Sequence, residues 1–301
     1  MKFKHIVVPT DFSPTANNAV KQALVLAARY DAKVTVTHAR VLYEDDPAAL
    51  SGKLKELKKN EEEIESELKK RMEESCDKEL SVKVNHEIIR GYSAPSAILN
   101  YLNTNTPDLV VIGTHGRSGV EHFLLGSVAE KVVRYAPCPV LTVNESSECG
   151  RAFPKIIVPV DFSELSIIAL KAAAELAEAG SEEIHLFYAV DKDVHPALYS
   201  WGMKSVLDIV PDIIQKAEIK MDQAAAQVPG LSKVKLIKRV DAGVPYKEIA
   251  RYVKEINADL VVIATHGLAG LDRMLLGSTT EKLIRAIKKP ILTLKKYNKA
   301  L

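Results

Sequence analysis

Glycine, serine and aspartate follow two apolar segments in each half of this sequence, with the spacing of a ligand-binding loop. Residues 113–127 read GTHGRSGVEHFLLGS, which places glycines at Gly113, Gly116 and Gly126 ahead of Ser127, the start of a segment with helical spacing. Glycines let a backbone approach a ligand closely, and the start of a helix offers free amides and the positive end of its dipole. The pattern therefore predicts an anion site, with phosphate as the anion.

The loop differs from the best-known phosphate motifs. It is neither a G-x-x-x-x-G-K-[ST] loop nor a G-x-G-x-x-G fingerprint. Ser127 with Glu130, and Ser278 with Glu281, fit the S-x-x-E pattern of a capping box. A helix-capping role for these serines is compatible with a phosphate site, because a capped helix still leaves amides that a phosphate can bind.

A second polar turn follows the first apolar segment of each half. Pro9, Thr10 and Asp11 come after KHIVV, and Pro159, Val160 and Asp161 take the same place in the second half. Asp11 is the only carboxylate in the immediate motif of the first half. Where these turns lie in the fold depends on the strands and helices that flank them.

The chain repeats itself, and the repeat defines two domains. IVVPTDFS at 6–13 recurs as IIVPVDFS at 156–163, and residues 108–143 recur at 259–294 with 19 identities over 36 positions. A repeat of this length indicates a duplicated domain rather than a short solenoid unit. The polar stretch 144–154 is typical of a linker. We predict domains over 1–146 and 153–301.

Each half alternates apolar segments with segments of helical spacing. In the first half we expect strands at 4–9, 33–39, 81–89, 108–113 and 139–143, and helices at 14–30, 47–79, 95–104 and 127–136. Ser13 and Pro14 are typical of a helix start, with serine as the cap. Alternation predicts an α/β fold, in which each domain is a five-stranded, parallel, doubly wound sheet of order 3-2-1-4-5. Ligands of such sheets bind at the carboxyl ends of the strands, where the strand order reverses between the first and the fourth strand.

The two motifs together resemble the universal stress protein family. The spacing Gly113-x2-Gly116-x9-Gly126-Ser127 is similar to the ATP-binding motif of that family, and IVVPTDFS is similar to its first strand and turn. The resemblance covers nearly the whole chain, twice. It implies two tandem flavodoxin-like (Rossmann-like) domains and, in the nucleotide-binding branch of the family, ATP or its relatives ADP and AMP, with or without Mg²⁺.

The resemblance also implies which residues contact the nucleotide. Thr10 and Asp11 would lie near ribose and adenine, Ala39 would meet adenine through its backbone, and glycines and helix amides would hold the phosphates. The full set of predicted nucleotide contacts is Pro9, Thr10, Asp11, Ala39, Gly113, His115, Gly116, Arg117, Gly126, Ser127 and Val128 in the first half, and Pro159, Asp161, Ala189, Gly267, Gly277, Ser278 and Thr279 in the second. We expect no catalytic set and no metal-ligating set among them.

The second half departs from the motif at two places. Ala264 replaces the first glycine, and Val160 replaces Thr10 and removes a hydroxyl. A methyl group at a position of close approach can exclude a ligand or shift it. We therefore expect the first half to bind nucleotide, and the second half to bind it more weakly.

Two other motif residues have competing interpretations. His115 could act in catalysis, but the sequence shows no Ser-His-Asp or Cys-His set, so we favour a histidine that satisfies loop backbone. Arg117 could reach a phosphate or be a solvated surface residue, and Leu268 replaces it in the second half.

Composition excludes several function classes. The net charge is only +2, which gives no electrostatic case for nucleic acid or a membrane surface, and three cysteines are too few and too scattered for a disulfide framework. No apolar stretch approaches the roughly 18 residues of a membrane span. We expect a cytoplasmic protein with reduced thiols.

Three functions fit these observations. The first is a regulator of the stress response in which an adenine nucleotide changes the surface shown to a protein partner, whose identity the sequence leaves open. The second is a slow ATPase or autophosphorylating enzyme, although no P-loop lysine is present. The third is a scaffold without nucleotide. The family resemblance further implies a pseudo-dimer of the two domains through their last strands, with further homodimerisation as an extension.

Overall fold

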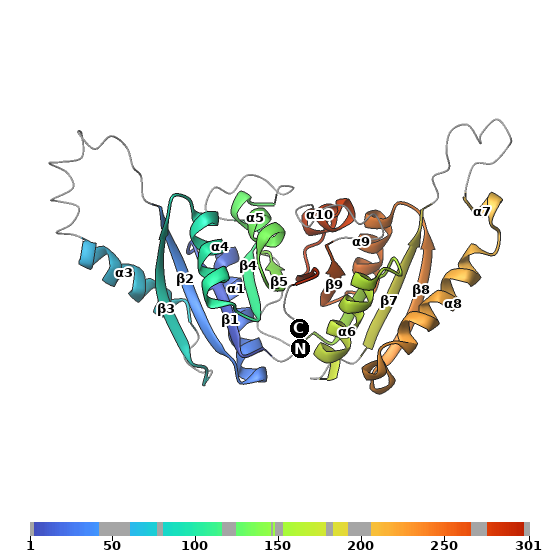
Figure 1. Cartoon of the computed structure of the whole chain (residues 1–301), viewed down its shortest axis with the longest axis horizontal. Helices are drawn as coiled ribbons and strands as arrows, with labels where there is room; N and C mark the ends of the chain where they lie inside the picture. Colours follow the sequence, from blue (N-terminus) through green and yellow to red (C-terminus); the bar gives the residue numbers. More distant parts are fainter. Residues whose placement is uncertain are drawn as a thin grey trace, which may run out of the picture. The chain divides into compact units, whose positions relative to one another are not determined.

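The computed structural model confirms the α/β fold in both halves. It describes residues 3–41, 61–76, 81–115, 125–145, 147, 153–178, 183–191, 206–265 and 276–297. The chain forms two compact units, the N-terminal unit over Lys2–Arg151 and the C-terminal unit over Ala152–Leu301. Within each unit, helices pack on five strands (Figure 1).

The N-terminal unit contains five strands in the order β3-β2-β1-β4-β5. Its elements are β1 (His5–Pro9), α1 (Pro14–Tyr30), β2 (Lys33–Val41), α3 (Glu61–Glu74), β3 (Val84–Gly91), α4 (Ala94–Asn105), β4 (Leu109–Gly113), α5 (Ser127–Tyr135) and β5 (Val140–Val143). All the pairings are parallel, and β1 lies between β2 and β4. The predicted order 3-2-1-4-5 and its reversal between β1 and β4 are therefore confirmed.

The C-terminal unit repeats this order as β8-β7-β6-β9-β10. Its elements are β6 (Lys155–Pro159), α6 (Glu164–Glu178), β7 (Glu183–Val190), α7 (Val206–Ile209), α8 (Ile213–Ala226), a 3₁₀ helix η2 (Pro229–Lys233), β8 (Lys235–Ala242), α9 (Pro245–Glu255), β9 (Leu260–Ala264), α10 (Ser278–Ala286) and β10 (Ile291–Leu294). Its strands also pair in parallel.

The central strands are apolar because they are buried on both faces. Ile6, Val7 and Val8 of β1 are fully buried, and so are Ile156 and Ile157 of β6. Helix α1 packs on β1, β4 and β5, while α4 packs on β2 and β3 beside α5. Parallel strands covered on both faces have this continuous apolar pattern.

Helix α1 begins and ends where the sequence indicates. Ser13 is the N-cap, and its hydroxyl accepts a hydrogen bond from the Ala16 amide, while Pro14 opens the first turn. The helix ends at Tyr30, and Asp31 follows in the left-handed conformation with φ of 52°. Such a residue closes a helix because it turns the chain away from the axis.

The long charged helix predicted over 47–79 is shorter at its carboxyl end. Within the described residues α3 ends at Glu74, and Ser75 and Cys76 form a turn that is closed by the bond from the Ser75 hydroxyl to the Met72 carbonyl. A serine hydroxyl that bonds a carbonyl of the preceding turn competes with the helical pattern. Residues 47–60 lie outside the described residues.

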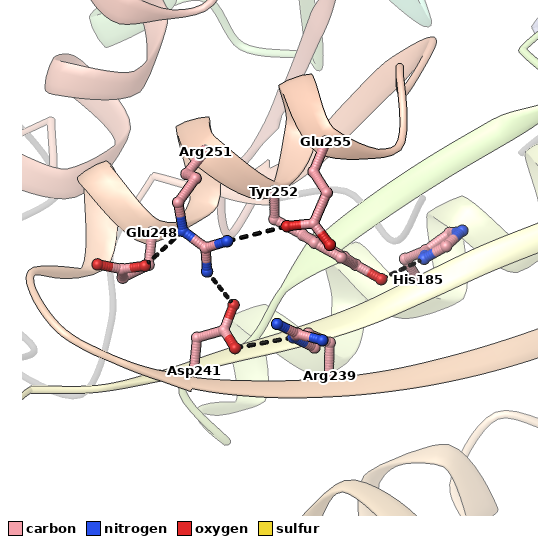
Figure 2. Close-up of polar contacts among 7 residues, drawn as sticks. All are labelled: His185, Arg239, Asp241, Glu248, Arg251, Tyr252 and Glu255. Carbon is pink, nitrogen blue, oxygen red and sulfur yellow. Dashed lines mark hydrogen bonds and ion pairs between the residues drawn. The ribbon is translucent and has the colours of Figure 1, made fainter.

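A charged network holds α9 against the edge strand β8 in the C-terminal unit (Figure 2). Arg251 of α9 donates to Asp241 of β8 at 2.6 Å, to Glu248 at 3.0 Å and to Glu255 at 2.9 Å. Arg239 donates to the other oxygen of Asp241 at 2.7 Å. One carboxylate on the strand therefore joins arginines from the strand and the helix.

Candidate functional site

The turn after β1 is organised by short-range hydrogen bonds. The Thr10 amide donates to the Thr37 carbonyl of β2 at 2.8 Å, and Asp11 Oδ1 accepts from the Ser13 amide at 3.0 Å. A carboxylate that accepts from an amide two residues later forms an Asx turn. The turn carries the chain from the carboxyl end of β1 into α1 and fixes the Asp11 backbone at the strand-order reversal.

A phenylalanine occupies the left-handed region at the same place in both units. Phe12 has φ of 66° and Phe162 has φ of 65°, although a bulky residue rarely adopts a positive φ. The Phe12 ring stacks on His38 with centroids 4.8 Å apart, and the Phe162 ring lies 4.7 Å from that of Tyr188. Repeated backbone strain of this kind is typical of functional sites.

The predicted adenine contacts lie beside this turn. Pro9 is the last residue of β1 and pairs with Thr37, while Ala39 lies two residues further along β2 and is half-buried. Pro159 and Ala189 hold the same places on β6 and β7. The structure therefore places these residues at or near the carboxyl ends of neighbouring strands in each unit.

Helix α5 begins directly beside the end of β4. The Gly126 amide donates to the Thr114 carbonyl at 2.8 Å, and Gly126 is the N-cap residue of α5. Ser127 is the first helical residue and is exposed, and Val128 follows it half-buried. The mouth of α5 thus opens at the same sheet edge as the Asp11 turn.

The predicted capping boxes are wrong. The N-cap residues are Gly126 and Gly277, and in the described part of the chain no side chain caps either helix. A capping box needs its serine at the N-cap, whereas Ser127 and Ser278 lie one residue inside the helix. Glu130 pairs instead with Arg134 at 3.0 Å, and Glu281 pairs with Arg285 at 2.6 Å.

Gly113 packs against the protein itself. A Cβ atom on this residue would lie 3.0 Å from the carbonyl carbon of Thr15 and 3.1 Å from the amide nitrogen of Ala16. Contacts at this distance force one of the two segments to move. The start of α1 therefore accounts for glycine at this position, a reason that the spacing alone did not reveal.

The hydroxyl of Thr15 is a site feature that the sequence analysis missed. Thr15 lies in the first turn of α1, and its Oγ1 donates to the carbonyl of His115. The Ser13 hydroxyl lies 3.1 Å from Thr15 Oγ1 and 3.5 Å from the same carbonyl. The one available signal was the replacement of Thr15 by Leu165 in the second half.

The His115 side chain turns towards its neighbour. His115 Nδ1 lies 3.0 Å from Thr114 Oγ1, and the buried Nε2 has no hydrogen-bond partner among the described residues. Gly116, Arg117 and Gly267, which the motif also predicts as ligand contacts, lie outside the described residues.

In the C-terminal unit, different hydrogen bonds hold the corresponding turn and helix start. Asp161 Oδ1 accepts from both the amide of Ser163 at 3.0 Å and its hydroxyl at 2.6 Å. Thr280 of α10 donates to the Ala264 carbonyl at 2.9 Å, and the Gly277 amide donates to the Thr265 carbonyl. Burial, and then the charge of Asp161, raise the pKa of the Tyr188 hydroxyl. Thr279 is half-buried in the first turn of α10.

The described residues form neither a candidate metal site nor a candidate membrane-spanning helix. Among them, no three or more His, Cys, Asp or Glu side chains gather in a way that could hold a metal ion. None of the helices formed by those residues has the length and apolar character needed to cross a membrane.

The chain is similar to proteins of one family over most of its length. The model of the universal stress protein family matches residues 2–144 and again residues 152–295. A universal stress protein of Methanocaldococcus jannaschii is 37% identical over 146 residues, which cover 48% of this chain and 83% of that protein. One of Mycobacterium bovis is 28% identical over 225 residues, covering 72% of this chain and 70% of that protein. The crystal structure of one from Archaeoglobus fulgidus has a similar fold, with a TM-score of 0.67 at 20% identity over 98% of this chain and 99% of that chain.

Proposed function

Because this chain belongs to the universal stress protein family, with two family domains in tandem, we propose that it is an adenine-nucleotide-dependent regulator whose main site lies in the N-terminal unit. The observation that carries the proposal is the mouth of α5. Its N-cap is a glycine, no described side chain caps it, and it opens beside the Asp11 turn. Free amides at a helix start, with the dipole behind them, favour an anion.

The described residues fit such a ligand in named roles. The amides of Ser127 and Val128 would hold phosphate oxygens, Asp11 would accept from ribose hydroxyls, and the backbone of Ala39 would meet the adenine edge. Thr10 and Pro9 complete the wall beside β2, where the Thr10 amide is already bonded to Thr37. Among the predicted contacts of the N-terminal unit, Asp11 is the carboxylate that would bind a Mg²⁺ accompanying the phosphates.

The C-terminal unit would bind nucleotide more weakly. Val160 replaces Thr10 and so cannot offer a hydroxyl, and Ala264 replaces Gly113. The mouth of α10 keeps a glycine N-cap and an exposed Ser278. The amides for a phosphate are therefore retained in this unit, while the contacts around them change.

Isothermal titration of the full chain with ATP, ADP and AMP tests the proposal, with and without Mg²⁺. The informative variant is Ser127→Asp. A carboxylate in the first turn is favourable for the helix, but it repels a phosphate at the same amides. We expect ATP affinity in the N-terminal unit to fall roughly 100-fold, the size of a close repulsion between like charges near a protein surface.

Two matched variants make the result specific. Ser127→Asn has similar size without the charge and should bind within a few fold of the wild type. Ser278→Asp makes the same change in the C-terminal unit and should affect only the weaker binding event. The proposal fails if none of the three nucleotides binds the wild type, and two equal tight sites would refute the asymmetry.

The regulatory part of the proposal has its own measurement. Hydrogen exchange of the full chain with and without saturating ATP should show slower exchange in the first turn of α5, because bound phosphate occupies its amides. A partner surface would appear as a second segment, distant from the site, whose exchange changes with ATP. If no such segment exists, the chain binds nucleotide without acting as a switch.

A further inference from the structure

One buried hydroxyl joins the two parts of the proposed nucleotide site. Thr15 lies in the first turn of α1, and its hydroxyl donates to the carbonyl of His115, which follows β4. Thr15 and Ser13 are each only 5% exposed, so water does not compete well for this bond. A hydrogen bond in such surroundings holds its partners more firmly than one at the surface.

The bond continues into helix α5. The residue before His115 accepts the Gly126 amide through the Thr114 carbonyl at 2.8 Å. A Cβ on Gly126 would lie 3.0 Å from that same carbonyl oxygen, so the N-cap of α5 packs directly on the Thr114–His115 backbone. The Asp11 turn and the mouth of α5 are therefore connected through Thr15, His115 and Thr114.

In the C-terminal unit, a residue at a different position supplies the hydroxyl that joins neighbouring segments. Leu165 stands where Thr15 stands, so that position cannot donate. There, Thr280 of α10 donates to the Ala264 carbonyl of β9, and Ala129 takes the place of Thr280 in the N-terminal unit. The C-terminal bond ties its helix to the strand that precedes it, but it does not reach the turn that carries Asp161.

We infer that Thr15 is a positioning residue that sets the nucleotide affinity of the N-terminal unit. This inference rests on the proposed function. A nucleotide that contacts both the Asp11 turn and the α5 amides must find them at a fixed separation. Holding that separation before binding lowers the ordering cost of binding and raises affinity.

Titration of the full chain with ATP tests this role through Thr15→Val and Thr15→Ser. Valine keeps the shape and removes the hydroxyl, so we expect Kd to rise roughly tenfold, the loss of one buried hydrogen bond. Serine keeps the hydroxyl and should bind within about twofold of the wild type. Thr15→Ala, which is smaller and favours helix, is the second variant if valine disturbs folding.

Two controls separate positioning from general stability. Thr280→Val removes the matched hydroxyl in the C-terminal unit and should leave the tight binding event unchanged. Combining Thr15→Val with Asp11→Ala should cost less affinity than the sum of the single losses, because positioning matters only while both contacts exist.

The possible failures are distinguishable. If the wild type binds no nucleotide, the proposed function itself is wrong. If the wild type binds ATP and both Thr15→Val and Thr15→Ala bind it equally well, Thr15 has no positioning role and this inference is overturned. Full additivity with Asp11→Ala would also overturn it.

Discussion

The two units share a backbone fold but differ in the polar contacts of the helix that precedes the fourth strand, which is α4 in one unit and α9 in the other. In the N-terminal unit, Tyr101 of α4 hydrogen bonds with Glu87 and Thr35. In the C-terminal unit its counterpart Tyr252 lies 2.8 Å from His185 Nδ1 and beside Arg239 (Figure 2). The duplicated domain has therefore kept the tyrosine and exchanged its partners, an acidic residue in one unit for a basic one in the other.

The same contrast appears at the sheet edge that carries the site. Both units retain the Asx turn and the glycine N-cap, the features that shape a ligand site. The hydroxyls that tie neighbouring segments together have moved, from Thr15 in one unit to Thr280 in the other. The two units therefore share these backbone features and differ in the side-chain hydrogen bonds that join neighbouring segments.

The largest effect should come from removing His185. This side chain is 3% exposed and lies between Tyr252 and Glu183, with Nε2 at 3.0 Å from Glu183 Oε1. His185→Leu leaves the buried tyrosine hydroxyl without that partner, which costs about 1–3 kcal/mol. Urea unfolding of the full chain measures the loss.

The matched change in the N-terminal unit should cost less. Thr35→Val preserves shape, and Tyr101 keeps its bond to Glu87. His5 Nε2, which lies 2.9 Å from Thr35 Oγ1, also loses a partner, but this imidazole is only half-buried and can bond to water instead. We expect a loss of about 1 kcal/mol, the usual net contribution of one hydrogen bond, although the Thr35 side chain is buried. Equal losses for the two variants would show that the exchange of partners has no energetic consequence.

A second comparison exchanges the residues at the end of the fourth strand of each unit. Gly113→Ala should destabilise the N-terminal unit by about 1–2 kcal/mol, because the new methyl group meets the Thr15 and Ala16 backbone. Ala264→Gly should cost about 0.5–1 kcal/mol through the extra freedom of glycine in the unfolded chain. Thermal unfolding of both variants decides whether the two units are packed differently here.

Acid should affect the C-terminal unit through Glu183. The hydrogen bond with His185, and then that with Lys235, lower the pKa of Glu183 below its usual value of 4.5. The stability from a lowered pKa is present above the unfolded-state value and is lost as the pH falls through the folded-state value. The stability difference between the wild type and Glu183→Gln should therefore shrink as the pH falls below about 4.5; a constant difference would contradict this.

The smallest effect should appear at alkaline pH in the N-terminal unit. Burial, and then the charge of Glu87, raise the pKa of Tyr101 to about 12. The stability from a raised pKa is present below the unfolded-state value near 10 and is lost as the pH rises through the folded-state value. The absorbance difference between the wild type and Tyr101→Phe should titrate near pH 12, whereas a midpoint near 10 would show an ordinary phenol.

The sequence predicted the sheet order and the start of α1 because these depend on local or repeated signals. Apolar strands such as residues 109–112 alternate with helical segments in both halves, and Ser13 with Pro14 marks a helix start by itself. Parallel strand order then follows from the alternation and the handedness of crossovers.

The sequence did not predict the contacts that distinguish the two sites. The Thr15–His115 bond joins residues 100 positions apart, and no periodicity encodes such a pair. The capping boxes failed because S-x-x-E fits equally well when the serine is the first helical residue and a glycine precedes it. A pattern of residue types fixes neither the register of a cap nor a long-range hydroxyl bond.

The glycine N-caps of α5 and α10 have a consequence for how each unit responds to its surroundings. A helix with a serine or aspartate cap carries its own anchor, but Gly126 and Gly277 provide none through a side chain. An anion that settles on those amides completes the helix from outside. Local order at the sheet edge would then follow the cellular concentration of that anion, as linkage between binding and folding requires.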